Sequence, residues 1–96
     1  MNLGKAIVKI REKTGMKQVT LASKVGISAT ALSFIESNKS RPSEETLNKI
    51  AKVFDTDVWF IYLTAIDPET DMSEEKRKTF NELFPGFQDK LLSFIK

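Results

Sequence analysis

Apolar side chains recur at helical spacing in short segments along the whole chain. In the first segment, Leu3, Ile7 and Ile10 follow at intervals of four and three residues, which places them on one face of a helix. No segment alternates apolar and polar residues with a period of two, as a half-buried strand would. Start and stop signals divide the chain into expected helices near 3–14, 17–25, 29–37, 44–54, 58–65, 73–84 and 87–95. The sequence therefore predicts an all-α fold.

The residues between these segments are typical helix stops and caps. Gly15, Gly26 and Asn38 follow the first three expected helices, and Gly and Asn tolerate the left-handed backbone that ends a helix. Ser28 and Ser43 stand where a hydroxyl can accept a hydrogen bond from the first turn of the next helix. We therefore expect helices of two to four turns joined by tight connections.

Composition excludes several classes of protein. The 96 residues suit a single domain and contain neither cysteine nor histidine, which removes disulfides, thiolate chemistry, the main zinc ligands and the commonest catalytic bases. The glycines stand too far apart for a phosphate loop. The longest apolar run, 58–63, is too short to span a bilayer, and the N-terminus has no signal-peptide pattern. We expect a cytoplasmic, non-enzymatic protein with no metal, cofactor or membrane partner.

Charge is distributed unevenly along the chain. Residues 1–42 hold eight lysines and arginines against two glutamates, a net charge of +6, whereas residues 67–96 carry a net charge of −2. A basic first half beside an acidic tail suggests an anionic partner for the first half.

The segment 18–36 has the features of a helix-turn-helix, in which two short helices are joined by a turn containing glycine. Ala22 is small where the two helices would cross, Gly26 lies in the turn, and Leu32 and Ile35 anchor the second of these helices. This segment is similar to the Cro/repressor-type (XRE, lambda-repressor-like) helix-turn-helix family. The resemblance continues through the helix that follows Pro42 and covers roughly residues 3–66.

The resemblance implies a five-helix DNA-binding domain over residues 1–66, whose partner is double-stranded DNA and whose third helix enters the major groove. The spacing agrees, because burying Leu32 and Ile35 turns the opposite face of helix 29–37 outward. The expected base-contacting residues are Ser28, Ala29, Thr30, Ser33 and Phe34. Hydroxyls pair with several bases, and methyl or aromatic groups suit the thymine methyl, so we expect thymine-rich steps to be favoured and DNA shape to supply the remainder.

Phosphate contacts and one ion pair complete the expected site. Similar proteins bind the DNA backbone with the start of the second helix and with the loop after the third. The matching residues here are Lys17, Gln18, Ser37, Asn38, Lys39 and Arg41. Asn38 stands where the family usually has glycine. The positions of Arg11 and Glu36 often form a salt bridge between the first and third helices in this family, which orients the third helix.

The closing helix 58–65 is more apolar than one small domain can bury, although Asp57 can cap its start. Beyond it, 67–71 reads as a linker, and 67–96 forms an extension with two expected helices. The apolar surface is covered either by this extension or by a second copy of the chain. We expect a homodimer formed by Trp59, Phe60, Tyr62, Leu63, Phe84, Phe87 and Leu91. An extension that only packs on its own domain is the alternative.

These features favour a sequence-specific transcriptional regulator, a repressor in particular. One alternative is an antitoxin that regulates its own promoter and binds a toxin, a protein partner, through the C-terminal extension. Another is a protein-interaction module that has lost DNA binding, which the weak set of base-reading side chains allows.

Overall fold

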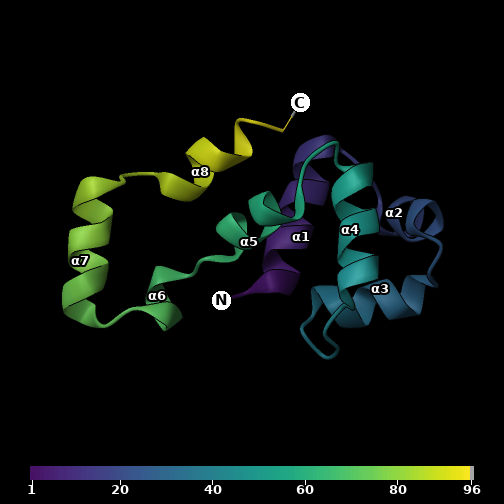
Figure 1. Ribbon diagram of the computed structural model, residues 1–96, viewed down its shortest axis with the longest axis horizontal. Coiled ribbons are helices and arrows are strands. Elements are labelled where there is room, and N and C mark those ends of the chain that lie inside the picture. Colours follow the sequence, from purple (N-terminus) through teal and green to yellow (C-terminus); the bar gives the residue numbers. More distant parts are fainter. Residues whose placement is uncertain (96) are drawn as a thin grey trace.

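Helices and short turns make up the chain throughout residues 1–95, which the computed structural model describes (Figure 1). Over this range the structure contains no strand, so the all-α prediction is confirmed. In chain order the helices are α1 (Leu3–Thr14), α2 (Gln18–Val25), α3 (Ala29–Glu36), α4 (Glu44–Val53), α5 (Val58–Ala65), α6 (Pro68–Asp71), α7 (Glu74–Leu83) and α8 (Phe87–Leu92).

The expected stop and cap residues define the first four helices. Gly15 and Gly26 end α1 and α2 with φ angles of 77° and 85°, a left-handed backbone that favours glycine. Asn38 adopts the same conformation after α3, with φ of 62°. The hydroxyls of Ser28 and Ser43 accept hydrogen bonds from the first turns of α3 and α4.

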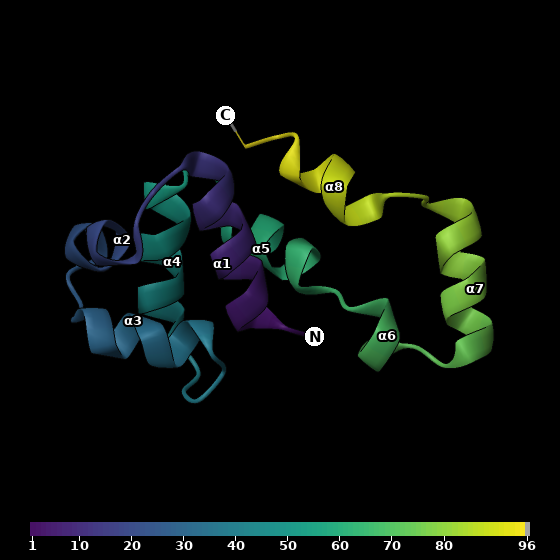
Figure 2. The same ribbon diagram turned by 180° about the vertical axis from the view of Figure 1, so that it is seen from behind.

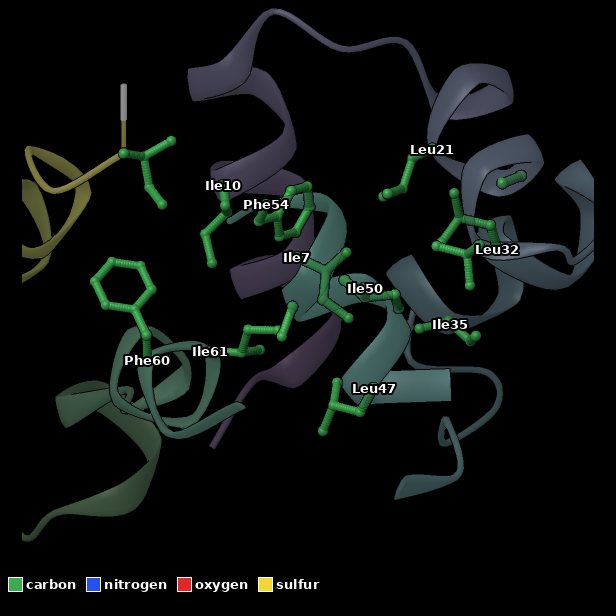
Figure 3. Packing of buried hydrophobic residues seen from close by; sticks show 14 residues of the cluster. Ile7, Ile10, Leu21, Leu32, Ile35, Leu47, Ile50, Phe54, Phe60 and Ile61 are labelled. Carbon is green, nitrogen blue, oxygen red and sulfur yellow. The ribbon is translucent and has the colours of Figure 1, made fainter. Parts of the chain in front are cut away.

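One hydrophobic core joins α1 to α5 (Figure 3). Its centre consists of fully buried aliphatic side chains, one or two from each helix: Ile7, Ile10, Leu21, Leu32, Leu47, Ile50 and Ile61. The helix α1 packs against α3 and α5, while α2 packs against α3 and α4. The core therefore fixes α2 and α3 relative to the rest of the bundle.

Two expectations about the start of α5 and the segment after it are wrong. Asp57 occupies the N-cap position of α5, but its carboxylate accepts from the indole N–H of Trp59 at 3.2 Å and makes no cap hydrogen bond with the backbone. The segment 67–71 is not a simple linker, because Pro68–Asp71 forms the short helix α6, whose start Asp67 caps through the N–H of Glu69 at 3.1 Å.

The two longer helices of the extension differ in how they pack. The helix α8 lies against α5 and α1, where Ile95 is buried and the ring of Phe94 meets that of Phe60 edge-on at 6.2 Å. The helix α7 has no buried residue, and both views show it standing away from the bundle (Figures 1 and 2). Only one of these two helices therefore covers α5.

Candidate nucleic-acid interface

The outward face of α3 is uncovered. Leu32 and Ile35 point into the core (Figure 3), so Thr30, Ser33 and Phe34 lie on the opposite side and are exposed. Ser28 and Ala29, at the start of the helix, are exposed as well. The extension lies at the other end of the molecule, as both views of the chain show (Figures 1 and 2). The five residues expected to contact bases therefore share one accessible surface.

Phe34 is the bulkiest side chain on this face. It is 46% exposed, and the ammonium of Lys39 lies 5.6 Å from the centre of its ring. An exposed aromatic ring beside a cation gives the surface an apolar group and a positive charge at one point.

The start of α2 presents unpaired backbone N–H groups beside a lysine. Lys17 is the N-cap residue, and no side chain of the described residues accepts a hydrogen bond from the first turn of this helix. The first N–H groups of a helix have no partner within it, and with the helix dipole they attract an anion. Lys17, Val19 and Thr20 are exposed there, so the helix start can meet a phosphate.

The side chain of Gln18 is held by a different partner. Its amide donates to Glu36 Oε1 at 2.8 Å. Arg11 donates from Nε to Glu36 Oε2 at 2.8 Å and from Nη2 to Oε1 at 3.1 Å, and its Nη1 donates to the carbonyl of Met16 at 3.0 Å. Glu36 is only 9% exposed. This network joins α1, α2 and α3, so the carboxylate at the end of α3 fixes how the helix-turn-helix sits on α1.

The loop 37–41 combines two exposed cations with one anchoring side chain. Lys39 and Arg41 are exposed, as is Ser37, whose hydroxyl donates to the carbonyl of Phe34 at 3.3 Å. Asn38 bonds to the start of α1: its Oδ1 accepts from the N–H of Gly4 at 2.9 Å and its Nδ2 donates to Asn2 Oδ1 at 2.8 Å. Asn38 therefore holds the loop against the start of α1.

Asn2 and Gly4 are the residues of this region that the sequence analysis missed. A Cβ on Gly4 would lie 2.5 Å from the carbonyl oxygen of Glu36 and 2.6 Å from that of Ile35, so only glycine lets α1 approach the end of α3 this closely. A glycine inside a helical segment was the available signal, since such a glycine often marks a close backbone approach.

The residues expected at a dimer interface are distributed over several environments. Trp59 is 59% exposed and Phe84 is 49% exposed, whereas Leu63, Phe87 and Leu91 are partly buried. Phe60 is 3% exposed and belongs to the hydrophobic core, so it is not available to a partner.

Tyr62 is partly buried and already bonded. Its hydroxyl donates to Glu44 Oε1 at 3.0 Å, and this hydrogen bond raises the pKa of Tyr62 above its ordinary value, because losing the proton would place two negative charges side by side. The contact joins α4 to α5, and the hydroxyl of Tyr62 is therefore already hydrogen-bonded within its own chain.

Residues 1–95 contain neither a metal-binding cluster nor a single membrane-spanning helix. Within this range no three Asp or Glu side chains are grouped so as to hold a metal ion. No single helix there is long and apolar enough to cross a membrane, and the bent pair α2 and α3 meets that test by length and composition only.

The helices α2 and α3 meet at 110° through the turn at Gly26, and the second of them presents an open polar face. This geometry defines a helix-turn-helix DNA-binding domain. The chain matches the family model described as "Helix-turn-helix" over residues 7–58, and it belongs to the XRE-type helix-turn-helix family of DNA-binding transcription regulators. No curated protein and no solved structure matches it significantly.

Proposed function

We propose that this chain is a sequence-specific repressor that places α3 in the major groove of its operator. The observation that carries the proposal is the uncovered face of α3, with Lys39 beside Phe34 on that face and Lys17 and Arg41 exposed on the neighbouring segments of the chain. Occupying an operator excludes other proteins from the same DNA by steric overlap, so repression needs no further surface.

Base recognition rests on small groups. Thr30 and Ser33 offer hydroxyls, while Ala29 and Phe34 offer apolar contacts to the thymine methyl. None of the side chains on this face makes the bidentate contact that arginine, asparagine or glutamine makes with a purine. We therefore propose a modest direct preference for thymine-rich steps, with the sequence-dependent shape of the duplex supplying the rest.

Phosphate contacts supply the larger part of the affinity. We propose that the backbone N–H groups at the start of α2 and the exposed side chains of Lys17, Lys39 and Arg41 bind the DNA backbone. Asn38 and the side chain of Gln18 act indirectly, because each is bonded within the chain and holds a phosphate-binding segment in place.

Binding is expected to weaken steeply with salt. If a dimer neutralises about six to eight phosphates, the logarithm of the association constant falls against the logarithm of salt concentration with a slope of roughly −5 to −7. Fluorescence polarisation on a labelled duplex measures this slope. Lys39→Gln is expected to reduce its magnitude by about two per dimer, whereas Lys78→Gln on α7 leaves it unchanged. A slope near zero contradicts the electrostatic mechanism, and no binding at any salt identifies a module that has lost DNA binding.

A homodimer accounts for the apolar surface that remains. The rings of Trp59 and Phe94 each meet the buried ring of Phe60 edge-on, and both residues are exposed, 59% and 75%, so they form an apolar patch on α5 and near the C-terminus. Two copies joined through this patch would present two α3 helices to half-sites about one turn of DNA apart. We propose residues 1–66 as the DNA-binding domain and 67–96 as the extension that completes the interface.

Sedimentation velocity tests the dimer. The chain is expected to sediment as a dimer at micromolar concentration, and Trp59→Ser is expected to raise the dissociation constant by about tenfold or more, because exposed aromatic residues often dominate such interfaces. Phe34→Ser is the matched control, since it removes an exposed aromatic residue from the opposite end of the molecule. A wild-type chain that stays monomeric above micromolar concentration contradicts the proposal.

The unpacked helix α7 favours a second candidate. It has no buried residue, and its last residue Leu83 and its C-cap residue Phe84 are exposed, as expected of an antitoxin whose extension binds a toxin protein. Purification of the chain from its native host distinguishes the two functions, because an antitoxin would be recovered with a stoichiometric second protein.

A further inference from the structure

A pocket of about 340 Å³ lies between the helical bundle and the extension. Its walls come from the start of α1, the C-terminal end of α5, and the helices α6, α7 and α8, which curve away from the bundle and back toward it (Figure 2). No residue of α3 lines the pocket, so the face proposed to contact bases does not use it.

Three phenylalanines form one wall of this pocket. The rings of Phe80, Phe84 and Phe87 lie 5.2–6.0 Å apart in tilted and edge-on pairs, and all three residues line the pocket. None of them is fully buried. The wall therefore offers aromatic surface to an occupant, and the faces of aromatic rings attract cations.

The other walls carry two carboxylates that are not paired with any cation among the described residues, those of Asp67 and Asp89. A third, that of Glu69, is paired with Arg77 at 3.0 Å, and two ammonium groups lie nearby, that of Lys5 in the lining and that of Lys9 on the lining residue Gln88. The lining includes the C-terminal end of α5 but also the starts of α6 and α8, so the helix dipoles oppose one another and the carboxylates of Asp67 and Asp89 set the preference for a cation. Lys5 is exposed and its long side chain can turn to water.

We propose that this pocket binds a small hydrophobic organic cation of the quaternary ammonium or phosphonium class. The apolar substituents lie on the phenylalanine wall, and the charge faces Asp67 and Asp89. A hydrophobic anion of the same shape meets the same rings but is repelled by the carboxylates of Asp67 and Asp89.

Asn2 connects the pocket to the loop 37–41, which is proposed to bind DNA. Asn2 lines the pocket, its backbone N–H donates to the carbonyl of Ala65 at 2.8 Å, and its side chain accepts from Asn38 at 2.8 Å. Asn38 anchors the loop that carries Lys39 and Arg41. An occupant that displaces Asn2 therefore changes the loop, which makes the cation a regulator of DNA binding. This second step rests on the proposed function.

Isothermal titration of the full chain with tetraphenylphosphonium, in the absence of DNA, tests the pocket. We expect one site per chain, and we expect Asp89→Asn to weaken binding by about threefold to tenfold. Glu82→Gln, which removes the same charge from α7 outside the lining, leaves the affinity unchanged. Tetraphenylborate, which has nearly the same shape and the opposite charge, binds more weakly. Equal affinity of the two ions, equal effects of the two variants, or no binding because a partner copy fills the pocket overturns the proposal.

The regulatory step has a separate measurement. Nuclear magnetic resonance of the side-chain amide groups of Asn2 and Asn38 follows the loop directly and needs no DNA. Saturation with tetraphenylphosphonium is expected to shift both signals. A shift at Asn2 alone overturns the coupling to the loop but leaves the proposal of a cation-binding pocket intact. If the chain does not bind DNA, both measurements still test the pocket and the coupling, because neither uses DNA.

Discussion

Replacing Gly4 with alanine is expected to destabilise the protein, by about 1–3 kcal/mol of unfolding free energy. In an ordinary helix interior the same change stabilises by about 0.5–1 kcal/mol, because alanine loses less backbone entropy. Here the added Cβ would lie 2.5 Å and 2.6 Å from two carbonyl oxygens at the end of α3 and 2.7 Å from Asn38 Oδ1. Backbone oxygens cannot turn aside as the tip of a side chain can, so α1 must move away from α3.

Urea denaturation measures this effect. Lys5→Ala is the matched control, because it changes the next residue of the same helix to alanine on an exposed side, and its effect is expected to stay within about 0.5 kcal/mol. A stabilised Gly4→Ala variant would show that α1 and α3 do not approach closely, and the anchoring of the loop 37–41 through Asn38 would fail with it.

Replacing Arg11 with methionine is expected to cost about 3–5 kcal/mol. The Arg11 and Glu36 side chains are only 15% and 5% exposed, so removing the guanidinium leaves a carboxylate buried without its opposite charge. Gln18 still donates one hydrogen bond to Glu36 but carries no charge. Because Glu36 ends α3, the orientation of that helix loosens together with the loss of stability.

The double variant Arg11→Met, Glu36→Met separates the unpaired charge from lost packing. It is expected to recover most of the stability in urea denaturation, because neither ionic group then remains buried. Lys49→Met serves as a surface control: the pair Lys49–Glu45 is 3.5 Å apart and largely exposed, and its loss is expected to cost less than about 1 kcal/mol. Equal effects of Arg11→Met and Lys49→Met would show that the Arg11–Glu36 network does not organise the helix-turn-helix.

The sequence alone predicts those features of the fold that depend on residues close together in the chain. The left-handed residues Gly15, Gly26 and Asn38 and the caps Ser28 and Ser43 act within a few residues of themselves, so local pattern predicts them. The prediction from sequence was wrong where one side chain has two possible hydrogen-bond partners nearby in the chain. Asp57 could bond the backbone or the indole of Trp59, and only the packed structure shows which.

Packing over long distances was harder to predict. The apolar stripe of α7 indicates which side of that helix avoids water but not what covers it, and in the structure the bundle does not. The short helix α6 carried a readable signal, since proline is favoured in the first turn of a helix.

In the candidate site, too, some features follow from local sequence and others depend on residues far away in the chain. The outward face of α3 follows from the spacing of Leu32 and Ile35, because burying one side of a helix determines the other. The roles of Gln18 and Asn38 depend on partners 18 and 34 residues away, Glu36 and Gly4, which no local pattern identifies.

The central claim is that the outward face of α3 lies against the duplex, and a matched pair of charge substitutions tests it most directly. Ser33→Glu places a carboxylate on that face, and Thr79→Glu makes the same charge change on exposed α7. Fluorescence polarisation is measured on the duplex that the wild-type chain selects from a random pool. We expect Ser33→Glu to weaken binding by about tenfold or more and Thr79→Glu to leave it near the wild-type value. Equal affinities of the two variants would contradict the account.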